Sequence, residues 1–517
     1  MPALTRLLHS YLDLLWHYDP AAASAAGVAS ADGALGRFDA ESMRQHLAAF
    51  RAVAAAVEEL EVEALEDEID RTALLDAIRT TIARIEYERP HARDPGFWLE
   101  HLGQALAALV LREEAEAALA GAALERIKAI PAFLEAGRAT LRHPPAPLTD
   151  RGLALLGPVG EVLVYAAARF GGVAPGGPEA VETATGSALG AMRRYGTALR
   201  DEMEPDPDPR AAALGEQRFE RRLHHQHALR EGAAELWRAA QRERESLDAQ
   251  LAAEAADLAP GRDWRELAAE LGREPAGDPL AALRDAVERA ARGAEAAGIV
   301  PAIDAPLEVA ALPAPVAALG RDPAYLAHAP GRAARLLIGA GLAERAALPV
   351  AVREGVPGRH LHEAFRAAAV SEIRRLLHAP AMSEGWALYA EQLADEAELW
   401  DSPGQRLLSL ARRAEAVARL ALGVGLHARG IAPSEGAALF SEWTGQDGSA
   451  AAAAVRRTLA HPGEGVAAEA GRRELVRLRR ESGVGMERPG ALREFHEAVL
   501  SRGGLAPGLV GWSMGLG

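Results

Sequence analysis

The sequence predicts a mainly α-helical protein, and three observations support that class. Apolar residues recur at three- and four-residue spacing over long stretches, which is the pattern of packed helices. Hydrophobic residues make up 49% of the chain but aromatic residues only 5%, so the core must consist mostly of Ala, Leu and Val. Small side chains of this kind favour closely packed helices. With 517 residues, the chain is long enough for more than one domain.

The first part of the chain is predicted to alternate between helices and breaks, because Pro and Gly interrupt helices. Helices are expected over residues 2–18, 39–88, 98–140, 211–255 and 276–298. A Gly/Ala loop and further breaks are expected at 19–38, 89–97, Pro144 to Pro147, 172–180 and 204–210.

Residues 299–333 have many prolines and no long periodicity. We expect this segment to be extended, with a short strand in "PLEVAAL" (306–312) and at most a small β element near 305–340. We interpret it as a hinge between an N-terminal helical lobe (1–298) and a C-terminal helical lobe (334–517). The C-terminal lobe should have loops near 401–404, 430–434, 445–449 and 484–490.

Charge and composition exclude several functions. The net charge is −16, and an acidic chain is a poor general binder of nucleic acid. The absence of cysteine excludes disulfides, thiolate zinc sites and Cys nucleophiles. Lys128 is the single lysine, so no phosphate-binding loop of the Gly-Lys-Ser/Thr type exists. We see neither a signal-peptide pattern nor about 18 uninterrupted apolar residues, and expect a cytoplasmic protein that does not bind membranes.

Two short stretches carry the candidate chemistry. The first is "REGVPGRHLHEAF" (353–365), and the second is "SEGWALYAEQL" (383–393). Glu384 and Glu391 lie two helical turns apart and therefore on one face, and Ser383 could cap the start of that helix. A zinc-peptidase site needs imidazoles from one helix, a carboxylate from a second and a further Glu as base. The simpler alternative is an acidic stripe that faces solvent.

Together the two stretches resemble the bacterial "domain of unknown function 885" family, whose members resemble zinc metallopeptidases. The family pattern is His-Glu-x-x-Pro-Gly-His-His followed by Glu-Gly-Trp-Ala-x-Tyr-x-Glu. The matching residues are Glu354, Pro357, Gly358, His360, Glu384, Gly385, Trp386, Ala387, Tyr389 and Glu391. The resemblance covers essentially the whole chain, and it implies a two-lobed, metallopeptidase-like helical fold with a cleft that faces these two motifs.

Three later segments are also similar to the family: 419–430, 455–479 and 492–510. They add four candidate residues: Arg419, His427, Arg457 and His496. We expect Arg457 to be free to hold an anionic group, because the sequence nearby offers it no obvious carboxylate.

The chain departs from the family pattern where the metal would be bound. Arg353 and Arg359 stand in place of two histidines. Later positions also differ, at Gly423, Thr458, Glu464 and Ala468. Guanidinium has no available lone pair and cannot act as a ligand, so we expect no metal and no cofactor at this site. The two arginines can instead replace the charge of a zinc ion and hold Glu354 and Glu384, with Glu391 as a third candidate.

These residues allow three hypotheses about function. The first is a non-peptidase, either a pseudoenzyme or a ligand-binding protein. The second is a metal-independent enzyme that uses the same cleft on a carboxylate-bearing or peptide-like substrate. The third is a zinc peptidase with atypical ligands. Catalytic candidates are Glu354, His360, Glu384, His427 and Arg457, and candidates for holding a small-molecule or peptide-like ligand are Arg353, Arg359, Tyr389, Glu391, Arg419 and His496.

A histidine cluster in "LHHQHAL" (223–229) is a further candidate. His224 and His227 could share one helix face and bind a metal, although no carboxylate partner is identifiable nearby. A polar helix surface is the simpler interpretation of this cluster.

Overall fold

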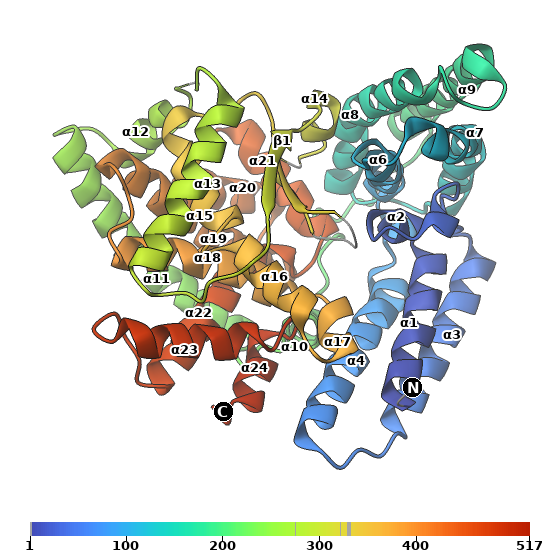
Figure 1. Ribbon diagram of the computed structural model, residues 1–517. Coiled ribbons are helices and arrows are strands. Elements are labelled where there is room, and N and C mark those ends of the chain that lie inside the picture. Colours follow the sequence, from blue (N-terminus) through green and yellow to red (C-terminus); the bar gives the residue numbers. More distant parts are fainter. Residues whose placement is uncertain (1–2, 275, 321, 328–331, 517) are drawn as a thin grey trace. The chain divides into compact units, whose positions relative to one another are not determined.

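The computed structural model describes residues 3–274, 276–320, 322–327 and 332–516 (Figure 1). Most of these residues lie in helices, which confirms the predicted class. The chain divides into two compact units. Unit 1 contains Met1–Leu60, Ile78–Ala213 and Pro313–Arg321, and unit 2 contains Glu61–Ala77, Leu214–Leu312 and Asp322–Gly517. The predicted hinge contributes to both units. The three-part division and the two-lobed shape with a cleft stay predictions.

Unit 1 is built from helices of very different lengths. Its α-helices are α1 (Ala3–Tyr18), α2 (Pro20–Ala25), α3 (Ala40–Glu58), α5 (Pro90–Arg93), α6 (Pro95–Val110), α7 (Glu116–Thr140), α8 (Ala146–Phe170), α9 (Gly177–Thr197) and α14 (Ala314–Ala317). Shorter 3₁₀ or π segments are η1 (Ala29–Ala31), η2 (Arg84–Glu88) and η3 (Ala198–Glu202). Helix α4 (Leu65–Ala83) begins in unit 2 and ends in unit 1.

The core of unit 1 surrounds α6, which contacts α2, α7 and α8. Trp98 of α6 is fully buried against Phe38 and Phe133, with ring centroids 5.7 and 4.9 Å away. Edge-on and tilted contacts of this kind suit the aromatic quadrupole. An aromatic cluster around Trp98 therefore forms part of the core of unit 1.

Unit 2 contains most of the remaining helices and the only sheet among the described residues. Its helices are α10 (Glu216–His227), α11 (Ala233–Leu258), α12 (Trp264–Leu271), α13 (Pro279–Ala296), α15 (Ala347–Glu354), α16 (Arg359–Ala368), α17 (Glu372–Leu376), α18 (Pro380–Glu396), α19 (Pro403–His427), α20 (Pro433–Thr444), α21 (Gly448–Ala460), α22 (Ala467–Glu481), α23 (Pro489–Leu500) and α24 (Pro507–Ser513), with the 3₁₀ turns η4 (Glu344–Ala346) and η5 (Glu464–Val466).

The sheet has three strands in the order β1 (Leu307–Ala311), β3 (Ala334–Ile338), β2 (Ala324–Leu326). Strands β1 and β3 are parallel, with Leu307 opposite Ala334, and β2 is antiparallel to β3. This confirms the predicted small β element and the strand within 306–312. However, the chain is not helical from 334 onward, because residues 334–338 form the central strand.

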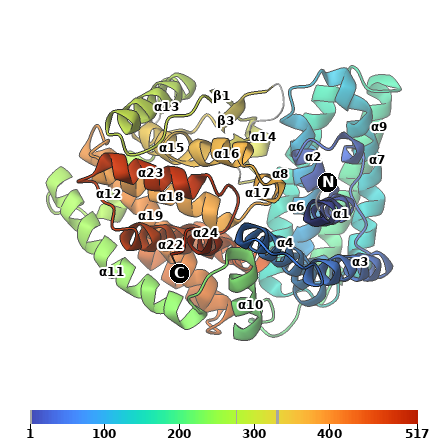
Figure 2. The ribbon, with the colours of Figure 1, turned by 60° about the horizontal axis from the view of Figure 1, so that its bottom comes forward.

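The contact between α18 and α22 is the closest helix packing that positions the site, and Figure 2 shows the two helices side by side. A Cβ atom added to Gly385 of α18 would lie 2.6 Å from the backbone of Gly471. One added to Gly471 would lie 1.9 Å from the carbonyl oxygen of Ala381. Side chains at either position would push the helices apart, so these two glycines allow α18 to be almost completely buried.

The expected breaks at 144–147 and 401–404 do separate helices, but the expected loop at 19–38 is partly wrong, because prolines also begin helices. Pro20, Pro147, Pro380 and Pro403 each occupy a position in the first turn of a helix. There the missing N–H costs nothing and the fixed φ is already helical. The expected loop at 19–38 therefore contains α2. Ser383 also lies inside α18, where its hydroxyl bonds His378, so it does not cap the helix start.

Helix α8 is long and apolar enough to cross a membrane by length and composition alone. The same description fits a helix of a globular domain. Within unit 1, α8 packs against α6, α7 and α9. The expectation that the chain does not bind membranes stays a prediction.

Candidate functional site

A tight turn brings the first motif together. Helix α15 ends at Glu354, and α16 begins at Arg359 after a turn with a cis peptide bond between Val356 and Pro357. A Cβ atom on Gly358 would lie 2.0 Å from the carbonyl oxygen of Arg353, so only glycine allows this close approach. The turn therefore places Arg353 and Arg359 near each other although they belong to different helices.

Helix α18 supplies the second motif, and it is joined directly to the turn. The indole N–H of Trp386 donates to the carbonyl oxygen of Pro357 over 2.9 Å, and Trp386 is fully buried. Glu384 and Glu391 both contact Arg353, which confirms that the two-turn spacing places them on one face of the helix. This face is turned toward α15 and α16, so the two glutamates are part of an ion-pair site, with Glu391 buried and Glu384 at its solvent edge.

The two arginines and three glutamates form one ion-pair network, which we call the Arg–Glu cluster. Arg353 donates from Nη2 to Oε2 of Glu384 over 3.1 Å and from Nη1 to Oε1 of Glu391 over 3.2 Å, and its Nε lies 3.4 Å from Oε1 of Glu354. Arg359 donates from Nε to Oε2 of Glu354 over 2.6 Å and from Nη2 to Oε1 of Glu384 over 2.7 Å. The predicted contact between these guanidinium groups and Glu384 is therefore confirmed for both.

Helix α19 completes the cluster with two residues that the sequence did not indicate. Ser409 donates its hydroxyl to Oε2 of Glu391 over 2.9 Å. Nη1 of Arg412 lies 3.7 Å from Oε1 of the same carboxylate. With Arg412 included, three guanidinium groups face three carboxylates, so the cluster has no formal net charge. The sequence carried no signal for these partners, because α19 reaches the site only through tertiary packing.

Burial makes the electrostatics of the cluster strong. Glu354 and Glu391 are buried, whereas the side chain of Glu384 is 36% exposed and marks the edge that faces solvent. Burial alone would raise the pKa of Glu384, but Arg359 and Arg353 outweigh burial and the pKa lies below its usual value. Burial opposes the charge of Arg359 as well, yet Glu354 and Glu384 raise its pKa. Glu384 and Arg359 are therefore held in their charged forms.

His360 links the site to the sheet rather than presenting a free imidazole. Its Nε2–H donates to the carbonyl oxygen of Ala305 over 2.9 Å, and its Nδ1 accepts from the hydroxyl of Tyr325, also over 2.9 Å. Burial is the largest cause of the raised pKa of Tyr325, which keeps this hydroxyl protonated as a donor. Both ring nitrogens of His360 are engaged in this way.

Tyr389 and His496 lie in the buried interior and bond to each other. Nδ1 of His496 donates to the carbonyl oxygen of Ile299 over 2.5 Å, so its Nε2 accepts from the hydroxyl of Tyr389 over 3.0 Å. Both side chains are fully buried. Tyr389 and His496 therefore form a hydrogen-bonded pair within the core.

His427 is a core histidine by the same criteria. Its Nε2–H donates to the carbonyl oxygen of Thr458 over 2.9 Å, and its Nδ1 accepts from the backbone N–H of Leu214 over 3.3 Å. The ring stacks on Phe219, with centroids 5.3 Å apart. Because both ring nitrogens are bonded and the ring is buried, His427 is not available as a general base in this structure.

The two remaining arginines of the predicted anion-binding set have partners of their own. Arg419 donates to Glu415 over 2.6 Å and lies over the ring of Phe440. Arg457 forms an ion pair with Glu464, although Pro462 stands between them in sequence. The expectation that Arg457 lacks a carboxylate partner is therefore wrong, because η5 returns Glu464 toward α21.

The histidines of α10 point to different partners. Nδ1 of His225 lies 2.7 Å from Asp76, and buried His227 bonds the carbonyl oxygen of Gly463 through Nε2 over 3.0 Å. Within the described residues, no group of three or more His, Cys, Asp and Glu side chains is placed to hold a metal ion.

We expect the protein to lose stability in mild acid, because His427 and His496 are buried in the folded state. Burial is the main cause that lowers the pKa of each ring from 6.5 to about 4. Between these values the unfolded chain binds more protons than the folded protein. The contribution of both rings to the free energy of unfolding should therefore be complete above pH 6.5 and be lost progressively as the pH falls from 6.5 to about 4.

Denaturant unfolding at about pH 7, 6 and 5 would measure this slope. The His496→Phe variant should be less stable at every pH, because Tyr389 loses its acceptor, but its slope should be shallower. Equal slopes in the two proteins would show that His496 does not titrate on unfolding as described.

The fold and the cluster together define a mainly helical protein with a small mixed sheet and an internal arginine–glutamate site. The chain belongs to the family described as "Bacterial protein of unknown function (DUF885)", whose family model matches residues 20–513. This match confirms the family that the two motifs predicted, and the description assigns no activity to it.

Two solved structures have a similar fold. One is a candidate lipoprotein of unknown function from Shewanella oneidensis, with 17% identity, a TM-score of 0.76 and 100% of both chains covered. The other is a candidate lipoprotein from Colwellia psychrerythraea, with 15% identity, a TM-score of 0.81 and 99% of both chains covered. At these identities the likeness shows the fold alone. No curated protein matches the chain.

Proposed function

We propose that this protein is a non-peptidase member of its family, in which two guanidinium groups have taken over the charge that a zinc ion supplies in metallopeptidase-like relatives. The observation that carries the proposal is the position of Arg359, which bonds Glu354 and Glu384 at once. In the family pattern these two glutamates would be the base and a metal ligand. Here both are already neutralised by a side chain that cannot coordinate a metal.

The charge balance of the cluster supports a structural or binding role over zinc catalysis. A divalent ion placed among Arg353, Arg359 and Arg412 would meet three fixed positive charges. The carboxylates that could attract the ion are each bonded to at least one guanidinium group. A cation therefore gains little at this site, because its attraction to the glutamates is offset by repulsion from the arginines.

The second hypothesis, a metal-independent enzyme, needs a residue that can exchange protons. The candidates for this role are Glu354 and His427. Glu354 is buried and paired with Arg359 over 2.6 Å, and burial lowers the pKa of His427 to about 4. A carboxylate engaged in this way and an imidazole with so low a pKa are poorly suited to proton transfer near neutral pH. We therefore place a ligand-binding or scaffolding role first.

The direct test is the zinc content of the purified full-length protein. We expect far less than one zinc per chain by elemental analysis, also after incubation with zinc sulfate followed by desalting, because the arginines exclude the ion. About one tightly held zinc per chain, lost with chelation together with peptide hydrolysis, would overturn the proposal.

A further inference from the structure

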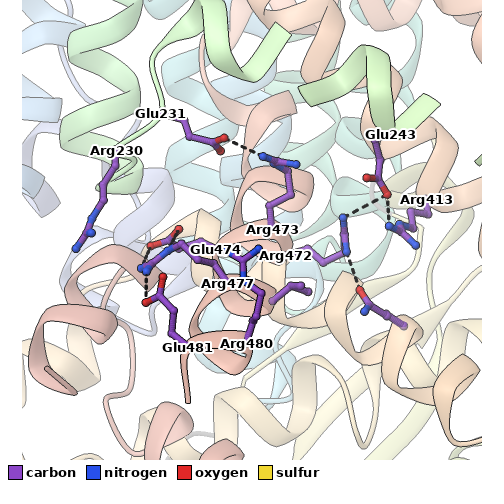
Figure 3. Close-up of a pocket in the computed structure, with 12 residues that line it drawn as sticks. Arg230, Glu231, Glu243, Arg413, Arg472, Arg473, Glu474, Arg477, Arg480 and Glu481 are labelled. Atoms are coloured by element: carbon purple, nitrogen blue, oxygen red, sulfur yellow. Dashed lines mark hydrogen bonds and ion pairs between the residues drawn. The ribbon is translucent and has the colours of Figure 1, made fainter. Parts of the chain in front are cut away.

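A second charged site lies in unit 2, apart from the residues of the Arg–Glu cluster. It is a cavity of about 630 Å³ between α11, α18, α19, α22 and the loop before α11. Figure 3 shows its side chains, with Arg230 and Glu231 on one side and the α22 side chains facing them. Its charged lining consists of Arg230, Glu231, Glu243, Arg413, Arg472, Arg473, Glu474, Arg477, Arg480 and Glu481. We call it the arginine cavity, and its volume is in the range of small-molecule sites.

The lining has an excess of positive charge, although the whole chain has a net charge of −16. Six arginines and four glutamates line the cavity, which leaves a formal excess of two. Buried Glu469, which bonds Arg472 over 2.7 Å from outside the lining, reduces this excess to one. The overall composition does not explain a cationic cavity in an acidic protein. The excess positive charge of this cavity favours an anionic ligand.

The glutamates do not satisfy all of these arginines. Arg473 pairs with Glu231 over 2.8 Å, and Arg477 engages Glu474 over 2.6 Å and Glu481 over 2.5 Å. Arg230 and Arg480, by contrast, have no side-chain hydrogen bond or ion pair to any residue in the described part of the chain. Both are exposed. Two guanidinium groups are thus available to a ligand without any existing pair being broken.

Deeper in the cavity the arginines compete for one carboxylate. Glu243 pairs with Arg413 and also lies 3.5 Å from Arg472. Burial is the main cause that lowers the pKa of Arg413, and the neighbouring charge of Arg472 lowers it further. The Nε atoms of Arg413 and Arg473 are buried and have no hydrogen-bond acceptor in the structure. Unsatisfied buried donors are costly, and because Arg413 and Arg473 line the cavity, their incompletely bonded guanidinium groups favour an anionic ligand there.

We propose that the arginine cavity is a binding site for a small molecule with at least two anionic groups of the phosphate or carboxylate type. Arg473, Arg477 and Arg480 follow each other at spacings of four and three residues, so α22 presents them on one face. Arg230 reaches the cavity from the loop before α11. Guanidinium groups bind phosphate and carboxylate oxygens in pairs, which suits a dianion held between these two walls.

The test uses the full-length protein and isothermal titration calorimetry with inorganic pyrophosphate at constant ionic strength. We expect saturable binding, and about tenfold or greater weakening in the double variant Arg230→Ala with Arg480→Ala, because both free guanidinium groups are lost. A parallel titration with succinate distinguishes the two anion classes: tighter pyrophosphate binding indicates a phosphorylated ligand, and tighter succinate binding a dicarboxylate. Unfolding of the free variant should be unchanged, because neither arginine has a partner to lose.

Two further variants make the result specific. Arg493→Ala removes one positive charge from an exposed position on α23, outside the cavity, and should leave binding unchanged. Glu481→Gln frees one side of Arg477 and should tighten binding by about two- to fivefold. Equal affinity in the double variant and the wild type, or equal heat from sodium chloride at the same ionic strength, would overturn the proposal.

Discussion

Replacing Arg359 with methionine should lower the free energy of unfolding by about 3 kcal/mol, the low end of the range of about 3–5 kcal/mol for breaking one side of a buried ion pair. The substitution leaves Glu354 buried and removes its shortest bond, which spans 2.6 Å. The effect on Glu384 is smaller, because its side chain is 36% exposed and keeps its bond to Arg353. The loss comes mainly from a carboxylate left without its closest cation.

Denaturant unfolding followed by tryptophan fluorescence would measure this loss, because Trp386 is bonded to the same turn. Arg292→Met is the matched control, since Arg292 and Glu288 form an exposed pair and should contribute less than about 1 kcal/mol. Arg359→Lys should fall between the two, because an ammonium keeps the charge but cannot bond two carboxylates as a planar fork does. A loss in Arg359→Met no larger than in the control would contradict the account of the cluster.

The stability difference between the wild type and Arg359→Met should depend on pH. In the wild type the pKa of Glu384 lies below its ordinary value of 4.5, although burial alone would raise it, because Arg359 and Arg353 outweigh burial. Its contribution to stability is therefore complete above pH 4.5 and is lost as the pH falls through the lower folded value. The difference in stability between the wild type and Arg359→Met should narrow in that acidic range.

Replacing both arginines with histidine, as Arg353→His with Arg359→His, should convert the cluster into a zinc site with about one zinc per chain. Two imidazoles together with Glu384 would provide the three protein ligands of a catalytic zinc centre. Removing two positive charges also leaves the three glutamates to attract the cation. The wild type should bind no stoichiometric zinc under the same conditions, so the expected change is from none to one equivalent.

Elemental analysis after desalting, together with thermal unfolding with and without zinc, would measure this gain. Adding Glu384→Gln to the double variant should abolish it, because the carboxylate ligand is lost while the histidines remain. Failure of the double variant to bind zinc while it stays folded would show that Arg353 and Arg359 do not occupy metal-ligand positions.

Zinc binding by the double variant should not bring full peptide hydrolysis. The family-like positions at Thr458 and Ala468 lack the phenol that could stabilise a developing oxyanion. Thr458 is also buried, and its carbonyl oxygen accepts from His427. Efficient hydrolysis of a peptide substrate by the zinc-loaded double variant would show that neither position matters.

The sequence alone was enough to predict the helical class, the small β element and the central contact of the cluster. Helical periodicity depends on residues within one or two turns of each other, so it can be read without tertiary information. The two-turn spacing of Glu384 and Glu391 is local in this sense. The resemblance to the family's metal motif then led to Arg353 and Arg359, because they stand where that pattern has histidines and their charge can replace that of a zinc ion.

Only the tertiary structure decided which other residues join the cluster and which do not. Ser409 and Arg412 arrive on α19, and Tyr389 and His496 turn out to satisfy each other within the core. Prolines were ambiguous in sequence, because the same residue can end one helix or begin the next. The arginine cavity depends on α11, α19 and α22, which are far apart in the chain. Such sites depend on how helices pack against one another, and local spacing contains no information about that packing.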